Sequence, residues 1–125
     1  MTSLQAHFFA IATPILASLS QIIIKWQILT AGQLPVGLPA KILFLCQFLL
    51  RPWVLLSLTV TFLSGITWII AMSKLEISTA YPYVAATFVI VPLAGVLLFG
   101  EHFSMGKVIG SCLVLLGIIV VLINS

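Results

Sequence analysis

The stretch LQAHFFAIATPILASLSQIIIKWQIL, from Leu4 to Leu29, decides the fold of this chain. It is long and apolar enough to cross a bilayer, because a spanning helix needs about 20 mostly apolar residues. Two polar side chains, Gln21 and Lys25, lie near its end at a spacing that places them on one helix face. Ionisable residues inside a span are candidates for a functional site. The stretch therefore predicts a membrane helix that carries a polar site.

Three further apolar runs are long enough to span, at Trp53–Ser73, Ile77–Phe99 and Met105–Ile123. The composition agrees, because 62% of the 125 residues are hydrophobic and only 6% are charged, against about 25% charged in soluble domains. We expect an all-α, multi-pass membrane protein with four transmembrane helices, and a single domain over residues 1–125.

Residues 40–50 are apolar but too short to cross a membrane. They form either a short helix in the membrane interface or an early start of the second span. The first and third loops carry Lys41, Arg51 and Lys107, whereas the second loop carries Lys74. Since cytoplasmic loops are rich in Lys and Arg, this distribution favours cytoplasmic first and third loops, with both termini outside.

The first three spans each carry a stripe of small or polar residues at helical spacing. Lipid gives apolar helices no reason to associate, so such stripes mark faces where helices meet. They comprise Pro14, Ser18, Gln21 and Lys25; Ser57, Thr61, Ser64 and Trp68; and Ser78, Tyr81, Ala85, Phe88, Pro92 and Gly95. The stripes are explained either by packing alone or by a substrate path between the helices.

The polar residues lack the patterns that several classes of function require. The sequence shows no paired carboxylates, no nucleophile–base signature and no metal cluster, so we expect no enzyme activity. His7 and His102 have no ligand-spaced partners, and Cys46 and Cys112 lack metal-ligand spacing. We expect no metal and no cofactor. A net charge of +3 supplies no basic patch for nucleic acid.

Four motifs, in order along the chain, resemble those of the four-helix members of the drug/metabolite transporter superfamily, which include small multidrug resistance proteins and EamA-like proteins. They are Gln21-Ile-Ile-Ile-Lys25, Ala80-Tyr81-Pro82, Gly100-Glu101 at the end of a span, and Gly110 to Gly117 in the last helix. The resemblance covers the chain apart from residues 30–52. It implies a small multidrug resistance-like fold that works as a dimer, with Gly106, Gly110 and Gly117 at the interface.

Within the superfamily, the first span distinguishes two kinds of transporter. Small multidrug resistance exporters exchange protons for cationic drugs at a first-span Glu, and here Ala17 or Ser18 takes that place. Their Trp after the Ala-Tyr element is replaced by Val84. The Gln-x-x-x-Lys and Ala-Tyr-Pro pattern is most similar to the two small subunits of the undecaprenyl-phosphate aminoarabinose flippase.

This resemblance implies a flippase, or a flippase subunit, that moves a polyprenyl-phosphate-linked sugar across the bacterial inner membrane. The partner would be a second copy of the chain or a second small four-helix subunit. One alternative is a small multidrug resistance-like secondary transporter of a small polar or cationic metabolite. Another is a membrane partner that transports nothing.

For a flippase, we expect a head-group site that contains a cation and a polar slot. Lys25 can contact phosphate as a point charge, and Gln21 can bond to phosphate or sugar oxygens. The expected substrate-binding residues are Gln21, Lys25, Ser18, Trp68, Tyr81 and Glu101, and Lys41, Arg51 and Lys107 would attract anionic head groups. The competing interpretations are a Lys25 that snorkels to the interface, an aromatic belt for Trp68 and Tyr81, and a surface position for Glu101.

Overall fold

The computed structural model describes residues 2–102 and 104–124, which form six helices and no strand. In chain order these are α1 (Ser3–Ala31), α2 (Leu38–Leu49), α3 (Pro52–Met72), α4 (Ile77–Val84), α5 (Thr87–Phe99) and α6 (Met105–Asn124). Within the described residues, four helical stretches are long and apolar enough to cross a membrane: α1, α3, α4 with α5, and α6. The chain is a multi-pass membrane protein, as its composition predicts.

The first span is one continuous helix of 29 residues that carries Pro14 in its interior. A capping box at Thr2 and Gln5 begins it, because the Thr2 hydroxyl accepts from the Gln5 N–H and the Gln5 side chain accepts from the Thr2 N–H. It ends at Gly32, whose φ of 92° favours glycine. Residues 40–49 belong to α2, which ends before α3 begins at Pro52, so the second span does not begin early.

The third span differs from the single helix that its sequence predicts, because it divides at Ala85 and Ala86 into α4 and α5. Backbone hydrogen bonds there change to three-residue spacing: Ala86 bonds to the Tyr83 carbonyl and Phe88 to the Ala85 carbonyl. Pro82 and Pro92, which lie on either side, have no N–H to donate. The chain thus bends where its regular helical bonding is weakest.

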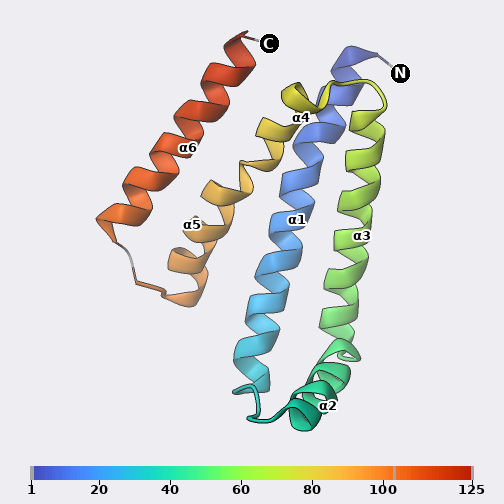
Figure 1. The fold of residues 1–125 in the computed structure, drawn as a ribbon, viewed down its shortest axis with the longest axis vertical. Coiled ribbons are helices and arrows are strands. Elements are labelled where there is room, and N and C mark those ends of the chain that lie inside the picture. Colours follow the sequence, from blue (N-terminus) through green and yellow to red (C-terminus); the bar gives the residue numbers. More distant parts are fainter. Residues whose placement is uncertain (1, 103, 125) are drawn as a thin grey trace.

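The core of the molecule is the contact between α1 and α3, which run side by side (Figure 1). Small residues allow this close approach, and Ala6, Ala10 and Ala71 are fully buried. The same interface contains hydrogen bonds between the helices. The Ser64 hydroxyl donates to the Thr13 carbonyl at 3.0 Å, and the Ser20 hydroxyl donates to the Ser57 carbonyl at 3.0 Å.

Two further pairs of hydroxyl groups, Thr13 with Thr67 and Ser20 with Thr61, are also hydrogen-bonded across this interface. The stripe predicted on the second span therefore faces α1 at Ser57, Thr61 and Ser64, where its members take part in packing. By contrast, α6 leans away from the bundle beside α4 and α5, and none of its described residues is buried (Figure 1).

We expect Ser20→Ala and Ser64→Ala to lower the free energy of unfolding, because each removes a hydrogen bond between α1 and α3. Bonds of this kind contribute roughly 0.6 kcal/mol on average in membranes, and Ser20 should show the larger loss because it has two partners. Ser73→Ala is the matched control, since the exposed Ser73 hydroxyl bonds only to the Ile70 carbonyl of its own helix. Reversible unfolding in lipid–detergent mixtures measures the difference, and equal stability of all three variants would contradict the role of this interface.

Candidate functional site

The polar stripe of α1 lies on a different face from the one that packs against α3. Near the start of α1, His7 Nδ1 and the Tyr83 hydroxyl of α4 are hydrogen-bonded at 2.7 Å. Offsets of three, four and seven residues place Pro14, Ser18, Gln21 and Lys25 on the same side of the helix as His7. This second face is therefore directed at α4 and α5.

Gln21 and Lys25 line a pocket of about 460 Å³ between α1, α5 and the start of α6, which we call the Lys25 pocket. Residues that are distant in sequence meet here, and four of them belong to the predicted site or to the predicted cationic surface. The complete lining comprises Gln21, Ile22, Lys25, Val91, Pro92, Gly95, Phe99, Glu101 and Lys107. The pocket thus combines an amide, two cations and a carboxylate with an apolar wall.

Lys25 and Glu101 form an ion pair in this pocket. The Lys25 Nζ lies 3.6 Å from Glu101 Oε1, and the two side chains are 46% and 41% exposed. The distance exceeds that of a close charge-assisted hydrogen bond, about 2.7–2.9 Å. The charges therefore neutralise each other while both remain accessible from the pocket.

The end of α5 places Glu101 over its own helix. Gly100 adopts the left-handed conformation, with φ 64°, and turns the chain back so that the Glu101 N–H donates to the Gly95 carbonyl at 3.2 Å. The carboxylate then lies against the buried Gly95, where a Cβ would be only 2.5 Å from Glu101 Oε2. The sequence placed Gly95 in the third-span stripe but not among the substrate-binding residues, and that stripe was the available signal.

Lys107 enters the pocket from the first turn of α6. The hydroxyl of Ser104 accepts from the Lys107 N–H at 3.2 Å and so caps the helix. The Lys107 Nζ donates to the His102 carbonyl at 2.6 Å. This bond ties the side chain to the α5–α6 connection and keeps a second cation beside the Lys25–Glu101 pair.

Three predicted substrate-binding residues lie outside the Lys25 pocket. Trp68 and Tyr81 contact each other edge to face, with ring centroids 6.0 Å apart, and Tyr81 lines a separate groove between α4 and α6. Ser18 is buried, and its hydroxyl has no hydrogen-bond partner in the described part of the chain. The structure therefore does not bring these side chains to Lys25.

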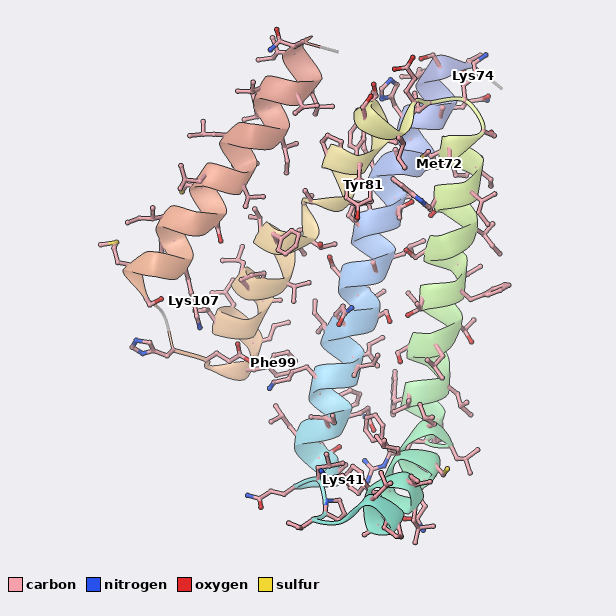
Figure 2. All side chains as sticks on the ribbon, viewed as in Figure 1. Lys41, Met72, Lys74, Tyr81, Phe99 and Lys107 are labelled. Atoms are coloured by element: carbon pink, nitrogen blue, oxygen red, sulfur yellow. The ribbon has the colours of Figure 1, made fainter. Side chains whose placement is uncertain are left out.

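Lys41 and Arg51 lie at the same end of the molecule as the pocket but do not line it. Figure 2 shows Lys41 at one end of the molecule and Lys74 at the other, beside the N-terminus, with Lys107 near mid-height at the start of α6. Helix α1 continues six residues past Lys25 to Ala31, about 9 Å along its axis. The Arg51 guanidinium is engaged there, since Nη1 donates to the Thr30 hydroxyl at 3.2 Å.

Comparison with known proteins shows that several curated proteins are similar to this chain. The chain is 34% identical over 116 residues to the probable 4-amino-4-deoxy-L-arabinose-phosphoundecaprenol flippase subunit ArnF of Erwinia tasmaniensis, which covers 90% of this chain and 91% of that protein. It is 31% identical over 68 residues to the corresponding subunit ArnE of Pseudomonas aeruginosa, covering 54% of this chain and 59% of that protein.

No protein-family model matches the sequence, and no solved structure matches it. The alignment with the Erwinia protein nevertheless extends over nearly the full length of both chains. With only a tenth of this chain outside it, the alignment includes the first-span polar residues and the glycine turn before Glu101. The chain belongs to the family of 4-amino-4-deoxy-L-arabinose-phosphoundecaprenol flippase subunits.

Proposed function

We propose that this chain is a subunit of a flippase in the bacterial inner membrane, and that it translocates an aminosugar linked to a polyprenyl phosphate. The observation that carries the proposal is the Lys25 pocket, in which an amide and two cations lie beside an apolar wall. The names of the relatives specify a ligand with matching parts: a sugar, a phosphate and a long apolar chain.

Each part of the pocket corresponds to one part of such a lipid. Lys25 and Lys107 supply positive charge for the phosphate, and the amide of Gln21 can both donate to and accept from sugar oxygens. Val91, Pro92 and Phe99 offer apolar contact to the first part of the chain. A volume of about 460 Å³ is within the usual range for small-molecule sites, about 300–1,000 Å³, so it suits the head group while the tail remains in the bilayer.

The same charges argue against a proton-coupled exporter of organic cations. Such an exporter needs a carboxylate that is free to bind the cation, because a buried cation without a counter-charge is very costly. Glu101 is the carboxylate of this pocket, and it is already paired with Lys25 and accompanied by Lys107. With one carboxylate and two ammonium groups, the pocket carries a net positive charge and favours an anionic ligand. The proposed role is transport, not catalysis.

We also propose that the chain works with a second small four-helix subunit or a second copy of itself. Many transporters place the substrate site between two repeats, and this chain has the size of one repeat. The exposed α6 is the candidate interface, because a Cβ at Gly110 or Gly117 would meet no atom within 4 Å. Gly106, Gly110 and Gly117 would allow a partner helix to approach closely.

Lys25→Ala should reduce transport of the phosphate lipid by about 10-fold to 100-fold, as expected for the loss of a hydrogen bond to a charged group. Lys25→Arg should retain part of the activity, because the charge remains while its geometry changes. Lys74→Ala, at the opposite end of the molecule, is the control. The measurement is translocation of a fluorescent polyprenyl-phosphate sugar in vesicles that contain the chain and its partner. Parental activity in Lys25→Ala would mean that this lysine only snorkels, and proton-coupled cation uptake without lipid binding would contradict the proposed function.

Replacing Gly110 and Gly117 together with Leu should weaken association of the subunits, because the larger side chains hold the partner helix away from α6. Leu113→Ala is a control in the same exposed helix that makes the surface smaller instead of larger. Crosslinking in lipid and sizing in detergent measure the effect. An unchanged dimer fraction in the double variant would place the interface elsewhere.

A further inference from the structure

We propose that Glu101 determines specificity for the amino group of the sugar, and that it does so by exchanging Lys25 for the substrate's ammonium group. This inference rests on the proposed function and names its substrate class more narrowly, as a zwitterionic head group. The relatives' names describe such a group, because an amino sugar joined to a phosphate carries a cation and an anion close together.

The charges of Lys25 and Glu101 are balanced when no substrate is bound. Without substrate, the Glu101 carboxylate and the Lys25 ammonium group neutralise each other at 3.6 Å. When the phosphate binds Lys25, Glu101 loses its cationic partner. An ammonium group on the same substrate restores the balance, because one internal ion pair is replaced by two pairs with the ligand. A sugar without the amine leaves Glu101 unpaired.

Lys107 bonds to the α5–α6 connection, whereas Glu101 is paired with Lys25. The Lys107 Nζ donates to the His102 carbonyl at 2.6 Å, whereas the ion pair found in the described residues joins Glu101 to Lys25. Glu101 and Lys25 are also both partly exposed, so a ligand in the pocket can contact either group. The pair is accessible as well as neutral.

The fold places the Glu101 carboxylate in the Lys25 pocket. Gly100 reverses the chain, and the backbone of Glu101 bonds to the Gly95 carbonyl. The carboxylate then occupies the space beside Gly95 that any other residue would fill with its Cβ. A negative charge therefore lies beside Gly95 and Lys25.

The test compares the binding of two lipids to the chain reconstituted with its partner. One is a polyprenyl phosphate that carries the aminosugar, and the other is the same lipid with a hydroxyl group in place of the amine. The parent protein should bind the amino lipid about 10-fold more tightly, the size expected for one hydrogen bond to a charged group. In Glu101→Gln this preference should fall to nearly one, mainly through weaker binding of the amino lipid. Glu76→Gln, which removes an exposed carboxylate elsewhere, should keep the parental preference.

Gly95→Ala provides a second, independent variant that keeps the charge but moves it. Its Cβ would lie 2.5 Å from Glu101 Oε2, so the flexible carboxylate must shift, while alanine itself favours the helix. The preference for the amino lipid should therefore fall in this variant too, and it decides the question if Glu101→Gln does not assemble.

The remaining outcomes of these binding measurements would contradict either the role of Glu101 or the proposed function. A parental preference in Glu101→Gln, or in a folded Gly95→Ala if Glu101→Gln does not assemble, would overturn the role of Glu101. Equal binding of the two lipids by the parent would overturn this inference but leave the proposed function intact. Failure of the parent to bind either lipid would instead contradict the proposed function itself.

Discussion

Hydrocarbon offers no hydrogen bonds, so a polar group within the bilayer is costly unless it has a partner inside the protein. This constraint acts twice on α1. On one face, hydroxyl groups of α1 and α3 bond to each other and to backbone carbonyls, which fixes the two helices side by side. On the other face, Lys25 has Glu101 as its partner, which connects α1 to the end of the third span. These two contacts connect α1 to α3 on one face and to the residue that follows α5 on the other.

The sequence was sufficient to predict the spans because composition alone determines which stretches can cross a membrane. The division of the third span was not predicted, because the prolines at 82 and 92 weaken the helix but do not determine where it bends. The structure places four of the predicted residues in one pocket: Gln21, Lys25, Glu101 and Lys107. Their spacing in the sequence could not predict this, because they belong to different helices and to the α5–α6 connection. Glu101 reaches Lys25 only because Gly100 reverses the chain.

Some residues predicted to bind substrate lie outside the Lys25 pocket, because a helical stripe alone does not determine which neighbour a side chain contacts. Trp68 shares a helical stripe with Ser57 and Ser64. The two serines pack against α1, whereas Trp68 contacts Tyr81 of α4. A stripe gives the direction of a side chain around its own helix but not the neighbour that it meets. That neighbour depends on how the helices lean and where a helix bends. The roles of Ser18, Trp68 and Tyr81 in substrate binding remain predictions.

In the proposed function, Lys25 binds the phosphate of a lipid-linked sugar. The most direct measurement is a solid-state NMR dipolar coupling between ¹⁵N in lysine side chains and ³¹P in the bound lipid, recorded in bilayers that contain no other phosphate. We expect ³¹P of the bound lipid to couple to the ¹⁵N of one lysine. That coupling should disappear in Lys25→Gln and persist in Lys74→Gln. Phosphorus coupling that is unchanged in Lys25→Gln, or no coupling to any lysine of a protein that has bound the lipid, would contradict this role of Lys25.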